Sequence, residues 1–187
     1  EGKTGNSVLL DRNAVTYLEG HREIPCEEQG GIYFLNRNKL SLYKPDSNEL
    51  TEVHQFDNVQ DVYVANDRLY ILDRSSNITI YNLLTQQEEK KLQYGDHASS
   101  IGADSKGRIY LAESNGNGDD YDLYLLSPEG TLLSQALSEE AVYGFCGFDE
   151  SNGNYYVDTY NNWRYWGYDH DTVSYTHLRA HETELHL

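Results

Sequence analysis

The sequence predicts an all-β protein, a β-propeller fragment of about four four-stranded antiparallel blades, and three observations predict this fold. The 187 residues include 17 Tyr and 15 Gly but only 3 Pro, a composition that favours short strands joined by polar turns. An apolar-Tyr-apolar segment recurs with a period of about 40 residues, at residues 32–35, 69–72, 109–112 and 155–158. Helical periodicity is missing, and the charged residues 83–92 are better interpreted as a hairpin than as a helix.

The segments around each tyrosine-led strand complete a repeated unit. A following strand is predicted to end in tyrosine, at Tyr43, Tyr81, Tyr124 and Tyr168. Polar turns come next and lead to alternating runs at residues 50–56, 89–94 and 131–137. One more short strand precedes the tyrosine, at residues 61–65, 100–103 and 143–148, and closes in a hairpin turn at residues 66–67, 104–107 or 150–154.

A repeat of four antiparallel strands over about 40 residues is typical of a propeller blade, and a flat stack or sandwich of the same strands is the alternative. We predict blades at approximately residues 8–56, 57–94, 95–137 and 138–172. Propellers of the type that this repeat suggests usually close with about six to eight blades. We therefore expect an open arc with apolar surface exposed at both ends and marginal stability.

The last residues form a separate segment. Residues 173–183 resemble one translated reading frame of a transposase sequencing adapter, so residues 173–187 are predicted to be a non-native tail on an assembled environmental (metagenomic) sequence. His177 and His181 have a spacing that suits metal binding on a helix. Because they belong to this tail, we do not interpret them as a metal site.

The charge of the chain excludes some partners. The formal net charge is −17, from 31 acidic and 14 basic residues, which repels phosphate backbones and anionic headgroups. No apolar run approaches the roughly 18 residues of a membrane span, so neither nucleic acid nor membrane insertion is expected. We predict an extracellular or cell-envelope location, with any export signal upstream of Glu1. Cys26 and Cys146 are interpreted as free thiols.

One segment carries a family resemblance. Residues 148–164, Phe-Asp-Glu-Ser-Asn-Gly-Asn-Tyr-Tyr-Val-Asp-Thr-Tyr-Asn-Asn-Trp-Arg, resemble the NHL repeat, whose blades read roughly D-x-x-G-N-[ILV]-Y-V-x-D-x-x-N-x-R. Residues 103–113 resemble the first half of that pattern, and the first two blades match only loosely. The resemblance implies an NHL-like, six-bladed-type propeller. Such propellers serve as binding platforms, signalling ectodomains and occasionally lactonases or lyases.

The candidate binding site is the mouth of the central channel, where the innermost strands and the loops entering them meet. The residues expected there are Asp57, Asn58, Asp61, His97, Glu139, Glu140 and Tyr143. An acidic mouth would suit a cation or a basic or hydroxyl-rich ligand. The same residues could equally be the polar lining of a water-filled channel.

Three further features are weaker candidates. Trp163 and Trp166 could form an aromatic platform for a sugar or peptide, although packing between blades is the default interpretation. Residues 115–120 and 149–153 contain the acidic and Asn/Gly residues of calcium loops, but hairpin turns use the same residues. Calcium is thus possible, and no other cofactor or metal is expected.

Two function classes follow. The first is a non-catalytic ligand- or protein-binding module of an exported bacterial protein, with a protein, peptide or carbohydrate partner. The alternative is a metal-dependent sugar-lactonase- or lyase-type enzyme, with calcium or zinc held at the channel by side chains such as Asp61, His97 and Glu140. No catalytic residue is assigned, because the sequence contains no GxSxG segment, phosphate-binding loop or nucleophile-base pair.

Overall fold

The computed structural model describes residues 22–26, 30–114, 121–138, 141–149, 154–160 and 170–175. Every regular element in these ranges is a β-strand, which confirms the predicted all-β class. No helix of the described ranges has the length and apolarity needed to cross a membrane.

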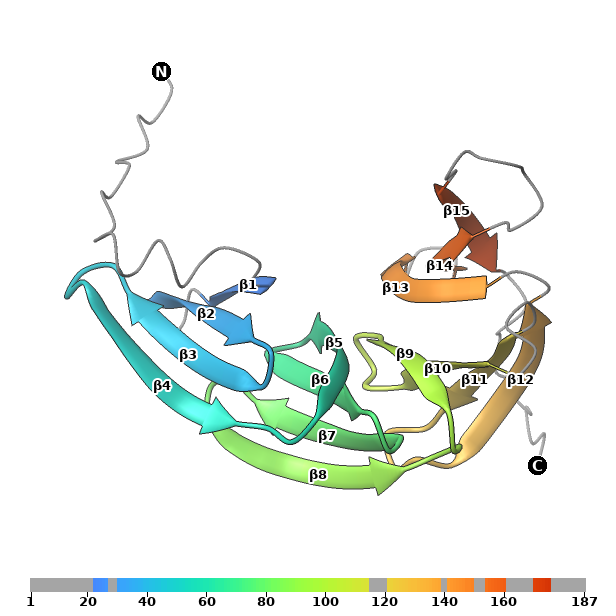
Figure 1. Cartoon of the computed structure of the whole chain (residues 1–187), viewed down its shortest axis with the longest axis horizontal. Helices are drawn as coiled ribbons and strands as arrows, with labels where there is room; N and C mark the ends of the chain where they lie inside the picture. Colours follow the sequence, from blue (N-terminus) through green and yellow to red (C-terminus); the bar gives the residue numbers. More distant parts are fainter. Residues whose placement is uncertain are drawn as a thin grey trace, which may run out of the picture. The chain divides into compact units, whose positions relative to one another are not determined.

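The strands form four antiparallel sheets in which chain neighbours are also sheet neighbours (Figure 1). The first sheet contains β1 (Arg22–Cys26), β2 (Gly31–Asn36), β3 (Lys39–Lys44) and β4 (Glu49–Gln55). The second contains β5 (Val59–Ala65), β6 (Arg68–Asp73), β7 (Asn77–Asn82) and β8 (Gln87–Gln93). The third contains β9 (Ala98–Ala103), β10 (Ile109–Ser114), β11 (Tyr121–Leu126) and β12 (Leu132–Ser138). The fourth contains β13 (Ala141–Asp149), β14 (Asn154–Tyr160) and β15 (His170–Tyr175).

The four tyrosines that define the repeat lie on the second strand of their sheets, as predicted. Tyr33 is in β2, Tyr70 in β6, Tyr110 in β10 and Tyr156 in β14. The first three are at most 1% exposed. Tyr70 belongs to the buried core between the second and third sheets and Tyr110 to that between the third and fourth, so the repeat is visible in the sequence because these core positions need a large side chain.

The register of the third sheet differs from the prediction. In the first sheet, the third-strand tyrosine Tyr43 pairs with Ile32, the residue before the repeat tyrosine. The corresponding partner of Ile109 in the third sheet is Leu126, and Tyr124 lies two residues earlier. The prediction that Tyr124 ends its strand is therefore wrong. Residues two apart point to the same face of a strand, so alternation alone does not distinguish Tyr124 from Leu126.

Three turns use one hydrogen-bonding pattern. In each, a side-chain oxygen of the first residue accepts hydrogen bonds from the backbone N–H groups two and four residues later. Asp73 does this after β6 (2.8 and 2.9 Å), Asp104 after β9 (3.0 and 2.9 Å) and Ser127 after β11 (3.2 and 3.2 Å). Buried Asp104 also pairs with Arg108 Nε at 2.6 Å. The predicted hairpin turn at residues 104–107 is thus confirmed.

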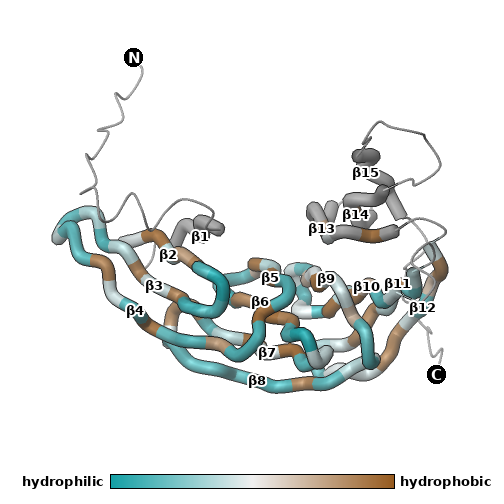
Figure 2. The backbone as a smooth tube through the Cα atoms, in the orientation of Figure 1, coloured by the Kyte–Doolittle hydropathy of each residue, from teal (hydrophilic) through white to brown (hydrophobic). Residues whose placement is uncertain are grey.

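The β7–β8 hairpin contains the charged residues 83–92. β8 begins at Gln87 and is extended to Gln93, so the hairpin interpretation is confirmed and the helical one is wrong. Most of β8 is hydrophilic, and its charged residues are largely exposed (Figure 2). Because one face of an antiparallel sheet can be exposed to solvent, this strand can carry many charged residues, and these made the segment ambiguous in the sequence.

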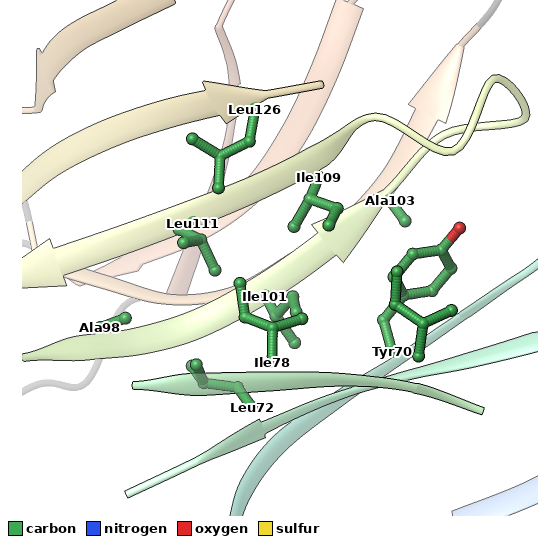
Figure 3. Packing of buried hydrophobic residues seen from close by; sticks show 10 residues of the cluster. Tyr70, Leu72, Ile78, Ala98, Ile101, Ala103, Ile109, Leu111 and Leu126 are labelled. Carbon is green, nitrogen blue, oxygen red and sulfur yellow. The ribbon is translucent and has the colours of Figure 1, made fainter. Parts of the chain in front are cut away.

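The described residues divide into two compact units. The first unit contains β1–β4, and its buried side chains include Tyr33, Leu40 and Leu42. The second unit contains β5–β15. Its larger core cluster joins the second and third sheets, and Figure 3 shows Leu72 and Ile78 facing Ile101. A second cluster joins the third and fourth sheets.

Candidate functional site

The innermost strands of the second unit lie side by side, β5 against β9 and β9 against β13. Gly102 of β9 makes this approach possible. A Cβ built on Gly102 would lie 2.8 Å from Cγ of Phe145 in β13, closer than real Cβ contacts allow. The Phe145 ring also packs on Tyr110, with ring centroids 6.2 Å apart. The inner strands β9 and β13 therefore meet in an apolar contact.

Asp61 joins two inner strands. Its Oδ2 accepts a hydrogen bond from the backbone N–H of Ile101 in β9 at 3.0 Å. The neighbouring Gln60 donates from Nε2 to the carbonyl oxygens of Ala98 and Ser99, at 3.1 and 3.3 Å. Two adjacent side chains of β5 thus satisfy donor and acceptor groups of the β9 backbone. This gives the predicted channel residue Asp61 a definite structural contact.

The loop before β9 is held by Glu113 of β10. Glu113 Oε1 accepts hydrogen bonds from the backbone N–H groups of Asp96 (2.8 Å) and His97 (2.7 Å). Gly95 has a φ of +71°, and a Cβ there would lie 2.7 Å from Glu113 Oε2. His97 itself is exposed. The structure therefore fixes the backbone of His97, while its side chain faces solvent.

Two tyrosines lie beside this carboxylate. The rings of Tyr94 and Tyr124 pack edge to face, with centroids 5.1 Å apart. Burial of the phenol raises the pKa of Tyr124 to about 12, and the negative charges of Asp122 and Glu113 act in the same direction. Burial also raises the pKa of Tyr94. Both phenols therefore remain protonated at neutral pH.

The structure describes only some of the remaining predicted residues. Asp57 and Asn58 belong to the first unit and are exposed. Tyr143 is a residue of strand β13. The predicted residues outside the described ranges are Glu139, Glu140, Trp163 and Trp166, together with residues 115–120 and 150–153. Within the described residues, no three His, Cys, Asp or Glu side chains are grouped as metal ligands would be. The channel-mouth set as a whole stays a prediction.

A pocket that the sequence analysis missed lies between the second and third sheets. Its volume is about 340 Å³. The second sheet and its β5–β6 turn contribute Asn66, Arg68, Tyr70, Ile80, Glu89 and Lys90. The third sheet contributes Ser105, Lys106, Gly107 and Pro128. The lining includes three cationic side chains and the carboxylate of Glu89. These lining residues therefore carry a net charge of +2 at neutral pH, in a chain whose net charge is −17.

The charged groups of the pocket are ordered by hydrogen bonds. Arg68 donates from Nε to Glu89 Oε2 at 2.7 Å and from Nη2 to Glu89 Oε1 at 3.3 Å. This pairing raises the pKa of Arg68 and lowers that of Glu89. Lys90 Nζ donates to the carbonyl oxygen of Pro128 at 2.8 Å. The side-chain amide of Asn66 donates to the Ser105 carbonyl, so hydrogen bonds connect the two walls twice.

The chain resembles known proteins in structure but not in sequence. No family model matches the chain, and no curated protein matches it in sequence. Among solved structures, BamB from Moraxella catarrhalis matches with a TM-score of 0.52 at 10% identity, over 72% of this chain and 38% of that one. The N-terminal domain of Nup159 matches with a TM-score of 0.51 at 13% identity, over 80% and 43% of the two chains. The WD40 domain of Toxoplasma gondii coronin gives 0.51 at 12% identity, over 71% and 39%.

The chain has a β-propeller fold. Each sheet is therefore a blade, and the first to fourth sheets are the first to fourth blades. The matched structures share at most 15% identity with the chain, so they show the fold alone, and the chain spans less than half of their length. The finer resemblance to the NHL repeat is not distinguished by these matches and stays a prediction.

Proposed function

We propose that this chain is a non-catalytic ligand- or protein-binding propeller module, and that the pocket between its second and third blades is a binding site. The single observation that carries the proposal is the cluster of Arg68, Lys90 and Lys106 around a defined cavity of about 340 Å³ in an otherwise strongly acidic chain. A concave site with a few ordered polar groups is the usual form of a ligand site.

The walls of the pocket support a preformed site. Lys90 and Asn66 of the second blade hydrogen-bond to backbone carbonyls of the third blade. Tyr70, which is 1% exposed, belongs both to the buried core between these blades and to the lining of the pocket. Because hydrogen bonds hold Lys90 and Asn66 and core packing holds Tyr70, a ligand would not need to order these groups, which lowers the entropic cost of binding.

Selection of peptides from a random-sequence library on the immobilised chain tests this function. The matched counter-selection uses the double variant Lys90→Glu/Lys106→Glu, whose thermal midpoint is measured first to show that it remains folded. We expect enriched peptides that bind the wild-type chain and lose binding to the double variant. Failure to enrich any such peptide, or equal binding to both proteins, would contradict the proposal.

The other functional expectations stay predictions. The extracellular or cell-envelope location is checked by fractionating cells that express the natural full-length protein. The lactonase- or lyase-type alternative requires calcium or zinc near Asp61 and His97, and a metal-dependent rise in the melting temperature would favour it. A carbohydrate partner is checked with the same immobilised chain on a glycan array.

A further inference from the structure

We infer that the pocket between the second and third blades binds the side-chain carboxylate of an acidic peptide. This inference rests on the proposed function and assigns the chemical class of its ligand. It is carried by the distribution of charge among Arg68, Glu89, Lys90 and Lys106 and by the apolar surface beside them.

The first step is that Arg68 and Glu89 neutralise each other. Two nitrogen atoms of the guanidinium contact both oxygens of the Glu89 carboxylate. The third, Nη1, donates to the backbone carbonyl of Asn66 at 3.3 Å. Asn82 Nδ2 adds a further hydrogen bond to Glu89 Oε1 at 2.7 Å. The planar donor fork of Arg68, the group that best matches phosphate, is therefore already occupied.

The second step is that two ammonium groups supply the remaining charge. Lys90 Nζ uses one of its three donors on the Pro128 carbonyl, which holds it at the wall of the pocket. The described part of the chain offers no hydrogen-bond or ion-pair partner for Lys106 Nζ. The nearby carboxylate of Asp104 is buried and paired with Arg108. Donors on Lys90 and Lys106 thus remain for an anion.

The third step concerns the apolar part of the pocket. Ile80, Pro128 and the ring of Tyr70 line it beside the lysines. Figure 3 shows Tyr70 at one end of the core cluster, beside Ala103. A glutamate side chain has two methylene groups that can pack on this surface while its carboxylate meets the ammonium groups. Two point charges and an apolar wall fit a carboxylate on a short aliphatic stem better than a phosphate, which favours an arginine fork.

NMR titration of the isotope-labelled chain tests the inference with three pentapeptides, acetylated and amidated at their ends. They carry glutamate, glutamine or phosphoserine at the centre of four alanines. We expect the glutamate peptide to shift the backbone amide signals of Lys106 and Gly107 saturably, with an affinity at least about 10-fold above that of the glutamine peptide. Equal affinities for glutamate and glutamine would overturn the inference, as would phosphoserine binding more than 10-fold more tightly than glutamate.

Charge variants separate the pocket from the overall field of the protein. Lys106→Gln is expected to weaken glutamate-peptide binding about 10-fold. Lys44→Gln removes the same charge from an exposed lysine of the first unit and should leave the affinity unchanged. Glu89→Gln removes the competing carboxylate and should tighten binding severalfold. Equal losses in Lys106→Gln and Lys44→Gln, or no gain in Glu89→Gln, would contradict the assignment.

These results are distinguishable from a failure of the proposed function. If library selection yields peptides that depend on Lys90 and Lys106 but bind equally well after Glu→Gln and Asp→Asn replacement, the pocket is a binding site and the carboxylate inference is wrong. If no peptide depends on those lysines, the proposed function fails, and the inference fails with it.

Discussion

The Asp61 carboxylate of β5 accepts a hydrogen bond from the Ile101 backbone N–H of β9, with Oδ2 and N 3.0 Å apart. This contact gives a stability role to a residue that was expected to bind ligand. We predict that Asp61→Ala lowers the free energy of unfolding by about 1 to 2 kcal/mol, measured by urea denaturation. Asp61→Asn keeps an acceptor oxygen and should lose less than half as much.

The same pair of variants separates a structural role from a metal-binding role. If Asp61 held calcium or zinc, Asp61→Asn would abolish stabilisation by the added metal while leaving the apo protein almost unchanged. If the asparagine variant is as unstable as the alanine variant without metal, acceptance of the Ile101 N–H is not the main role of Asp61.

Gly95 should tolerate a side chain less well than other glycines with positive φ. Gly95→Ala would place Cβ 2.7 Å from Glu113 Oε2, at a φ of +71°. Gly107→Ala is the matched control, because its φ is +76° and the nearest atoms lie 3.7 Å from the built Cβ. We expect about 1 kcal/mol of destabilisation at Gly107 from backbone strain alone. Gly95→Ala should cost at least about 1 kcal/mol more in thermal or urea denaturation, and equal losses would show that Glu113 moves aside freely.

Tyr124 should make the fold sensitive to alkali. Its pKa is raised from 10.0 to about 12, so the protonated phenol stabilises the folded state. That contribution is complete below about pH 10, the unfolded value, and is lost as the pH rises towards about 12. Urea midpoints measured across this window should fall less steeply in Tyr124→Phe than in the wild-type chain. Parallel slopes for the two proteins would contradict the raised pKa.

Two shortened variants examine the last strand. β15 spans His170–Tyr175, so it includes three residues of the segment predicted to be non-native, and Val173 pairs with Val157 of β14. We expect the chain ending at Tyr175 to keep the melting temperature of the full chain. The chain ending at Thr172 should melt no more than a few degrees lower, because it loses three pairs from an edge strand. A large drop on removing residues 176–187 alone would argue against the predicted non-native tail.

The strand pattern was predictable because its determinants are local. Tyr70 and Tyr110 each stand in a short continuous apolar run bounded by turn residues, which is typical of a buried strand, and Asp104 and Gly107 suit the turn between β9 and β10. That Leu126, and not Tyr124, pairs with Ile109 was not predictable. Both residues face the same side of β11, and only pairing with β10 shows which one stands opposite Ile109.

The pocket was harder to predict than the fold, because its residues come from turns and strands far apart in the sequence. Arg68 follows the β5–β6 turn, Lys106 lies in the β9–β10 turn, and Lys90 is in β8. One signal was present in the repeat. Arg68 and Lys106 stand near equivalent turns of successive blades, and equivalent turns lie at the same end of neighbouring blades. Aligning the repeats by their turns as well as by their tyrosines would have placed these two cations together.

The bonds from Gln60 and Asp61 to β9 limit how this protein can be recombined. The inner strand of the third blade obtains hydrogen-bond partners at Ala98, Ser99 and Ile101 from side chains of the blade before it. A third blade inserted after a foreign blade would keep its own four strands but lose these three hydrogen bonds. The natural cassette for duplication or shuffling is therefore a blade together with the inner-strand side chains that precede it, and chimeras should be joined upstream of Gln60.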